Sequence, residues 1–230
     1  ILYSARCDEF RTKEGQEKAY ATCKLIGLDG LVAIGGDGTF RGAQDLSKFG
    51  ISVVGIPGTI DNDIVCTDYT IGFDTAANTA VECMDKLRDT MQSHERCSVV
   101  EVMGRNCGDI ALNTALSTGS EIVIVPEMTN WSVDEIAHRL NALVDRGNQR
   151  ASIIVAEGAY KTMAPFDVYE FMKDYPSGSR PVFPGSPMDA YFLSRVVEHK
   201  VKKTEVRSTV IGYTQRGSQP TARDAAFAFE

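Results

Sequence analysis

Residues 31–39 read LVAIGGDGT, and residues 51–63 read ISVVGIPGTIDND. Each stretch opens with a short aliphatic run that predicts a buried strand, and each ends in a loop carrying glycine and carboxylate groups. In an open parallel sheet, ligands bind at the carboxyl ends of the strands. If the two strands are neighbours, the loops face one crevice. Together they could hold a metal-bound polyphosphate next to an alcohol that must lose a proton.

The same alternation of strand and helix patterns continues along most of the chain, at about 25–35 residues per unit. Further strands are expected at residues 98–102, 121–125, 152–156 and 207–213, and helices at 11–28, 40–49, 74–91, 108–118, 133–144 and 190–200. This alternation predicts an α/β fold with a mostly parallel sheet. Residues 159–188 carry five prolines and lose the pattern, so a surface excursion with one helical turn near 168–172 is expected there.

Composition excludes several classes of function. The chain has 230 residues, 43% of them hydrophobic, and a net charge of −7, which argues against a nucleic-acid-binding surface. No apolar run approaches the roughly 18 residues of a membrane span. The six cysteines form no C-x-x-C pair, which favours reduced thiols in a cytoplasmic protein. The chain begins with Ile and stops inside a predicted helix, so we expect sequence to be missing at both ends.

The glycine-rich loop at residues 35–39 is the first candidate for chemistry. Glycines let a phosphate approach backbone N–H groups, and the start of the following helix adds partial positive charge. Asp37 beside them could hold Mg²⁺ directly or through water. A tight strand-to-helix turn with an Asp or Thr cap explains the same residues without a ligand. The loop matches neither the Walker A nor the G-x-G-x-x-G pattern.

The second loop carries Asp61 and Asp63, two residues apart in a segment that reads as extended. Two close carboxylates repel each other, which raises the proton affinity of one of them and suits a general base. Thr59, just before them, could donate a hydrogen bond to a transferring group. The alternative is a pair of Asx turns on a solvated loop.

Arginines and a glutamate lie next to several of the other strands. Arg105 follows a strand end and a glycine, so a role with phosphate is favoured, whereas Arg96 precedes a strand and is equally explained as a surface charge. Arg207 and Arg216 bracket the last strand and could serve different faces or different subunits. Glu157 closes the 152–156 strand. The three histidines show no nucleophile or metal partner by spacing and are interpreted as structural.

Taken together, these motifs resemble the 6-phosphofructokinase family. The matches are GGDGT (35–39), PGTIDND (57–63) and MGR (103–105), supported by SAR (4–6), TDYTIGF (67–73), SHER (93–96) and QRG (215–217). The resemblance implies two similar Rossmann-like three-layer domains with mostly parallel sheets and an active site in the cleft between them. Residues 1–72 would belong to the larger, ATP-binding domain. Residues 73–213 would form the sugar-phosphate domain, with an insertion near 159–188, and 214–230 would return to the larger one.

The resemblance also assigns roles in transfer of the ATP γ-phosphoryl group to the 1-hydroxyl of fructose 6-phosphate. Asp61 would be the base, Thr59 and Asp63 would lie near the reacting oxygen, and Arg105 would stabilise the transferring group. Asp37 would hold Mg²⁺. The ATP site would comprise Arg6, Cys7, Gly36, Asp37, Gly38 and Thr39. The sugar phosphate would be bound by Met103, Gly104, Glu157, Tyr213 and Arg216.

Two further expectations concern subunits and effectors. Arg96 and Arg207 would reach the sugar phosphate of a neighbouring subunit, which implies a homotetramer. A nucleotide or phosphoenolpyruvate effector would bind at positions matching Arg88, Gly119, Glu121, Arg146 and Arg150.

The small residues Gly38 and Gly58 indicate ATP as the donor, because pyrophosphate-dependent relatives carry Asp and Lys there. Tyr213 departs from the usual His, and the segment between Glu157 and Arg207 is longer than in compact relatives. The alternatives are a pyrophosphate-dependent sugar-phosphate phosphotransferase and a non-catalytic regulatory subunit. The intact Asp37, Asp61, Asp63 and Arg105 argue against the latter.

Overall fold

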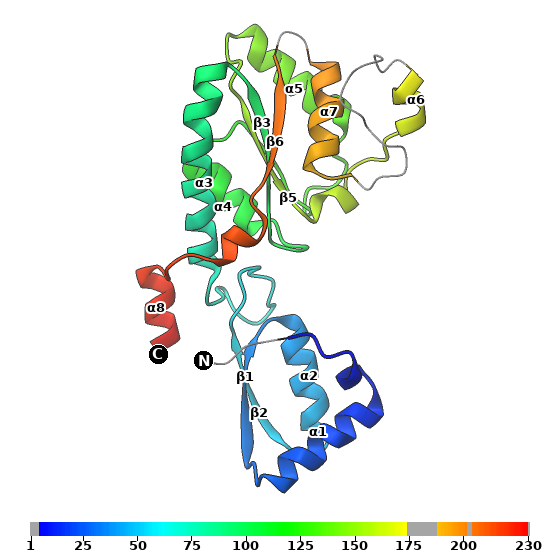
Figure 1. Cartoon of the computed structure of the whole chain (residues 1–230), viewed down its shortest axis with the longest axis vertical. Coiled ribbons are helices and arrows are strands. Elements are labelled where there is room, and N and C mark those ends of the chain that lie inside the picture. Colours follow the sequence, from blue (N-terminus) through cyan, green and yellow to red (C-terminus); the bar gives the residue numbers. More distant parts are fainter. Residues whose placement is uncertain (1–4, 174–187, 202–203, 230) are drawn as a thin grey trace. The chain divides into compact units, whose positions relative to one another are not determined.

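The computed structural model describes residues 5–173, 188–201 and 204–229, and the chain divides into two compact units (Figure 1). Unit 1 comprises Ile1–Thr59 and Asp63–Ile71, and unit 2 comprises Ile60–Asn62 and Gly72–Glu230.

Unit 1 is built around two parallel strands, β1 (Gly30–Gly35) and β2 (Ser52–Pro57). The strands pair in register from Gly30 opposite Ser52 to Gly35 opposite Pro57. The helix α2 (Asp37–Ser47) connects them and buries its apolar residues Ala43 and Leu46. The short helix η1 (Glu9–Arg11) and the helix α1 (Lys13–Leu25) precede the strands. The Thr12 hydroxyl accepts a hydrogen bond from the Gly15 N–H and so caps the start of α1.

Unit 2 is a three-layer structure around a four-stranded sheet with the order β4-β5-β3-β6. The strands are β3 (Cys97–Val102), β4 (Ile122–Ile124), β5 (Ser152–Ala156) and β6 (Val206–Val210), and every pair is parallel. The helices α3 (Phe73–His94) and α4 (Asp109–Thr118) lie on one side of the sheet, and α5 (Val133–Asp145) and α7 (Ala190–Lys200) on the other (Figure 1). Shorter elements are η2 (Ala159–Lys161), α6 (Val168–Lys173), η3 (Gly212–Arg216) and α8 (Ala222–Phe229).

The main hydrophobic core lies between this sheet and the helices α5 and α7. β5 is buried along its whole length, as expected for a parallel strand covered on both faces. Alternate residues of β3 and β5, such as Val99 and Ile153, face Leu140 of α5 and Leu193 of α7 in one fully buried cluster. The α/β class with parallel strands, predicted from the sequence, is confirmed.

The helix α2 and the strand β6 differ from the prediction at the ends that carry candidate site residues. α2 begins at Asp37 instead of Phe40, so the glycine-rich loop is shorter than expected. β6 ends at Val210, and Gly212 with φ 57° turns the chain into η3, so Tyr213 lies on a 3₁₀ turn and not in the strand. In the excursion, the expected turn at 168–172 is present as α6, while residues 174–187 lie outside the described part of the chain.

Residues 214–230, which the resemblance assigns to the larger domain, cluster here with unit 2. The reason is the buried carboxylate of Asp224 on α8, which accepts hydrogen bonds from the N–H groups of Gly72 (2.9 Å) and Thr75 (2.8 Å) and from the Thr75 hydroxyl. The residue before α3 is Gly72, which has no side chain to cap the helix, so Asp224 supplies the missing acceptor. The domain boundaries themselves stay predictions.

Replacing Asp224 with Ala should therefore destabilise unit 2. The change leaves two N–H groups of the first turn of α3 without an acceptor, at a cost of about 1–3 kcal/mol. Thermal unfolding followed by circular dichroism should show a midpoint several degrees lower than that of the wild type. The exposed Asp85 on the same helix, changed to Ala, is the control. Equal midpoints for the two variants would show that Asp224 does not cap α3.

Candidate functional site

The first candidate region is the junction of β1 and α2 in unit 1. β1 ends at Gly35 and α2 begins at Asp37, so only Gly36 separates them. The unpaired N–H groups of the first turn of α2 therefore lie directly at the end of the strand, which is a favourable position for an anion. A side chain at Gly35 would come within 2.3 Å of the Thr39 hydroxyl, whereas one at Gly38 would meet no atom within 4 Å. Gly35 is thus needed for packing, and Gly38 faces open space.

The loops after β1 and β2 contact each other, as the sequence predicted for neighbouring strands. The Gly58 N–H donates to the Gly35 carbonyl at 3.0 Å. A side chain at Gly36 would come within 3.3 Å of Thr59. The Asp37 carboxylate is partly exposed and accepts a hydrogen bond from Arg41 Nε at 3.1 Å. Unit 1 thus brings Gly36, Asp37 and Thr59 close together.

The loop that carries the two aspartates is not uniformly extended. Asn62 has a left-handed backbone with φ 54°, and its amide donates to Asp109 Oδ2 at 2.7 Å, at the start of α4. The expectation that the loop is extended is therefore wrong at Asn62. Asp61 clusters with unit 2 and Asp63 with unit 1.

In unit 2, the end of β3 is held to the two strands beside it by hydrogen bonds from its backbone. The Met103 N–H donates to Gln215 Oε1 of η3 at 3.0 Å, and the Arg105 N–H donates to Glu157 Oε1, just after β5, at 2.7 Å. Gly104 and Arg105 both have positive φ, 139° and 58°. A left-handed arginine is uncommon and is favoured only where the surroundings stabilise it, which often marks a functional site.

A small cavity of about 160 Å³ lies at these strand ends. Its lining includes three of the predicted sugar-phosphate residues, Met103, Glu157 and Tyr213, together with Glu101, Val102, Val210 and Gly212. The guanidinium group of Arg216 lies 5.9 Å from the centre of the Tyr213 ring, a distance at which cation–π attraction operates. Arg216 therefore lies beside Tyr213, which lines the cavity.

Glu101 was not predicted as a site residue. One oxygen of its carboxylate accepts hydrogen bonds from the Tyr160 hydroxyl at 3.0 Å and the Ala190 N–H at 3.1 Å. Burial raises the pKa of Glu101 above its usual range, although these two donors partly oppose the effect. Burial and the Glu101 carboxylate together raise the pKa of Tyr160. The one sequence signal for this network is a glutamate inside an otherwise apolar strand, VVEV at residues 99–102.

Arg96 and Arg207 do not join this cavity within one chain. Arg96 precedes β3 and Arg207 is the second residue of β6, so both lie where the strands begin. The cavity lies where the strands end, and a strand advances about 3.3 Å per residue, which separates Arg96 from Met103 by roughly 20 Å. Both arginines instead form ion pairs with Glu205, each at 2.7 Å.

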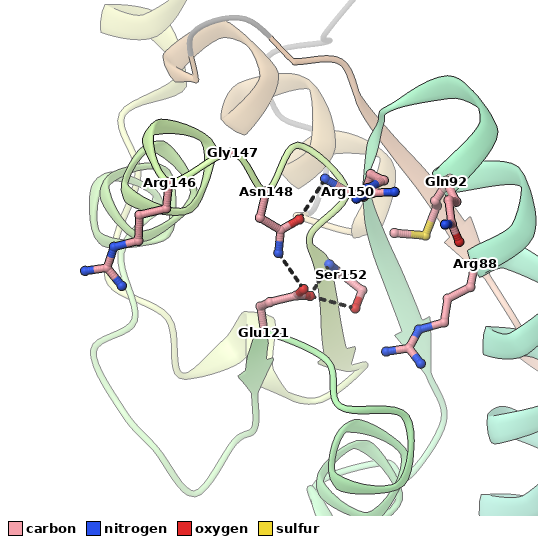
Figure 2. A pocket seen from close by; sticks show the side chains of 9 residues that line it. Arg88, Gln92, Glu121, Arg146, Gly147, Asn148, Arg150 and Ser152 are labelled. Carbon is pink, nitrogen blue, oxygen red and sulfur yellow. Dashed lines mark hydrogen bonds between the residues drawn. The ribbon is translucent and has the colours of Figure 1, made fainter.

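A second, larger pocket of about 510 Å³ lies at the beginning of β4 and β5 (Figure 2). Four of the five predicted effector residues line it: Arg88, Glu121, Arg146 and Arg150. The fifth, Gly119, lies beside it, since a side chain there would come within 3.8 Å of Arg88 Nη2.

Glu121 is held in a fixed position in this pocket. Figure 2 shows its carboxylate directed at Asn148 and Ser152. It accepts from Asn148 Nδ2 at 2.8 Å, the Ser152 N–H at 2.7 Å and the Ser152 hydroxyl at 3.1 Å. Three arginines around one carboxylate leave an excess of positive charge, which suits a ligand that carries phosphate.

Three general observations concern the described residues. No group of three or more His, Cys, Asp or Glu side chains in the described ranges is arranged to hold a metal ion. All six cysteines belong to these ranges and carry free thiols. Within the same ranges, no helix combines the length and the apolar character needed to cross a membrane.

The family model described as Phosphofructokinase matches this chain over residues 1–230. The ATP-dependent 6-phosphofructokinase of Thermoanaerobacter sp. (strain X514) is 44% identical over 229 residues, and that of Clostridium botulinum (strain Hall) is 46% identical over 228 residues. Each match covers 99% of this chain, which spans 62% of the length of these relatives.

Among solved structures, the phosphofructokinase of Saccharomyces cerevisiae superposes with a TM-score of 0.76 at 28% identity, covering 98% of this chain and 30% of that one. The Pichia pastoris phosphofructokinase in the T-state gives a TM-score of 0.79 at 29% identity, covering 97% and 23% of the two chains.

The raised pKa of Glu101 gives a pH-dependent prediction for the variant Glu101→Gln. The usual pKa of a glutamate is 4.5, and that of Glu101 in the folded protein is higher. Between these two pH values, the folded protein binds a proton at Glu101 more readily than the unfolded chain does. The wild type therefore loses stability as the pH rises through this window, whereas Gln does not titrate. The unfolding midpoint of Glu101→Gln relative to wild type should rise with pH across the window and then stay constant. The exposed Glu82→Gln is the control, and a pH-independent difference would contradict the prediction.

Proposed function

Because this chain belongs to the phosphofructokinase family, we propose that it acts in transferring the γ-phosphoryl group of ATP to the 1-hydroxyl of fructose 6-phosphate, giving fructose 1,6-bisphosphate in glycolysis. The identity to relatives named ATP-dependent 6-phosphofructokinase supports the reaction. The structural observation that carries the proposal is the left-handed Arg105, held by Glu157 beside a cavity that Met103 and Tyr213 line. We also propose a cytoplasmic location, which the free thiols support.

ATP would bind in unit 1 at the start of α2. The N–H groups of its first turn and the approach offered by Gly36 and Gly38 suit phosphate oxygens. The remaining proposed residues are Thr39, in the same turn, and Arg6 and Cys7, which are exposed. Mg²⁺ would neutralise charge on the phosphates and would be held by Asp37. A single carboxylate fits this ion, since Mg²⁺ keeps several waters and takes other ligands from substrate phosphates.

The reaction would depend on three residues of the PGTIDND loop and on Arg105. Asp61 would accept the proton of the attacking hydroxyl, while Thr59 and Asp63 would orient the groups around it. Arg105 would neutralise charge on the group in transfer. This division of labour fits phosphoryl transfer, where positioning and electrostatic stabilisation supply most of the catalysis.

The sugar phosphate would occupy the cavity at the strand ends of unit 2. Met103, Gly104 and Glu157 would hold the sugar, and Tyr213 and Arg216 its phosphate. A tyrosine hydroxyl can donate a hydrogen bond but offers no positive charge, so Arg216 would supply the positive charge. Arg96 and Arg207 lie at the other end of the sheet and would serve the site of a second copy. We therefore propose a homo-oligomer, specifically a tetramer.

An effector would bind in the arginine-lined pocket of Figure 2. We propose a nucleotide or phosphoenolpyruvate there. The presence of Arg88, Arg146 and Arg150 in the lining of one pocket supports an anionic ligand.

Asp61→Asn tests the proposed base. The amide cannot accept the proton, so kcat with ATP and fructose 6-phosphate should fall by about 10²–10⁴-fold, with the binding of fructose 6-phosphate largely retained. A coupled assay measures the rate, and the exposed Asp29→Asn serves as the control. Turnover equal to that of the control would remove Asp61 from the mechanism.

Gly38→Asp tests the assignment of ATP as the donor. Nothing lies within 4 Å of a side chain at this position, so the variant should fold normally. The added carboxylate lies beside Asp37 and the proposed phosphate site, and like charges should raise the KM for ATP by at least about tenfold. Gly38→Ala separates the effect of charge from that of size. Wild-type activity with pyrophosphate but not with ATP would contradict the assignment.

A further inference from the structure

We propose that Glu205 is a positioning residue that holds the guanidinium groups of Arg96 and Arg207 side by side, as a two-arginine clamp for the phosphate of the sugar substrate. This inference rests on the proposed function and deepens it, because it adds a positioning residue to the proposed sugar-phosphate site. Three lines of geometry support it.

The parallel sheet brings the three side chains together. Glu205 precedes β6 directly and Arg207 lies two residues further on, so both side chains project from the same face of the extended chain. Cys97 pairs with Val206, and the Cys97 N–H donates to the Glu205 carbonyl at 2.9 Å. Arg96, one residue before Cys97, therefore lies next to Glu205 on the neighbouring strand.

One oxygen of Glu205 bridges the two arginines. Oε2 lies 2.7 Å from Arg96 Nε and 2.7 Å from Arg207 Nη2. Each guanidinium group keeps further N–H donors that have no partner within the described part of the chain, and those donors are available to an anion. The three side chains together carry one net positive charge, which attracts phosphate.

The clamp is accessible to a ligand. The side chains of Arg96 and Arg207 are 36% and 31% exposed, and that of Glu205 is 50% exposed. Arginine forks bind phosphate through paired hydrogen bonds when two donors face the same way. A carboxylate that contacts only one donor of each arginine leaves the rest of the fork free.

Glu205 has two opposing effects on a phosphate. It restricts the rotamers of two long side chains and reduces their mutual repulsion, so less ordering is needed when phosphate binds. It also repels the phosphate directly, but partial exposure and salt weaken that repulsion. We expect the positioning effect to be larger, because Glu205 orders two side chains at once.

The test compares Glu205→Gln with Glu95→Gln in the enzyme. Gln keeps the shape of Glu205 but removes the charge that bridges the arginines. Glu95 is the matched control, because it is an exposed carboxylate that adjoins Arg96 in sequence and forms no ion pair with either arginine. For Glu205→Gln, the KM for fructose 6-phosphate and the inhibition constant for orthophosphate should both rise by about five- to tenfold, with kcat changed by less than about twofold. Glu95→Gln should match the wild type in all three.

The result also separates positioning from general stability. A loss of structure would lower kcat and the unfolding midpoint together, whereas a positioning role changes the KM and the orthophosphate constant alone. An unchanged or lower KM in Glu205→Gln overturns the proposal. If the wild type does not phosphorylate fructose 6-phosphate, the proposed function fails. The role of Glu205 in phosphate binding is then tested separately, by measuring orthophosphate binding to the two variants by calorimetry. Weaker binding to Glu205→Gln than to Glu95→Gln supports it, and equal binding overturns it.

Discussion

The parallel pairing of β3 with β5 on one side and β6 on the other is the constraint on which the candidate sites of unit 2 depend. Because the three strands run in the same direction, their ends meet at one edge of the sheet and their beginnings at the other. One edge brings Met103, Arg105 and Glu157 together around the small cavity. The other brings Arg96 and Arg207 together at Glu205. A shift in register would separate the members of both groups at once.

Glutamates hold positive or hydrogen-bond-donating groups in place at each of these locations. Glu157 accepts a hydrogen bond from the backbone of Arg105, and Glu205 forms ion pairs with two guanidinium groups. Glu121 lies in a pocket lined by three arginines and accepts hydrogen bonds from Asn148 and Ser152. A chain with a net charge of −7 can thus present locally basic pockets. Of these glutamates, Glu205 is the one that contacts guanidinium groups directly.

Much of the fold could be predicted from the sequence, because hydrophobic periodicity and glycine positions reflect local geometry. The strand at 152–156 and the helix at 190–200 were predicted at their observed limits. The sequence left open whether the first two strands are neighbours, and the pairing of β1 with β2 shows that they are. The cap of α3 depends on a tertiary contact: Asp224 of α8 accepts hydrogen bonds from Gly72, the residue before α3, and from Thr75, and nothing local to residues 214–230 indicates that partner.

The sequence by itself determined the residue types available for chemistry, the family to which the chain belongs and the order of its parallel strands and helices. Only the tertiary structure decided which of those residues meet. Glu101, Gln215 and Glu205 gave little signal as single residues, since their roles arise from strands and turns far apart in the chain. The separation of Arg96 and Arg207 from the small cavity at the strand ends is likewise invisible in a motif. It follows from the length of a strand, which places the two ends of one sheet too far apart for a single small ligand.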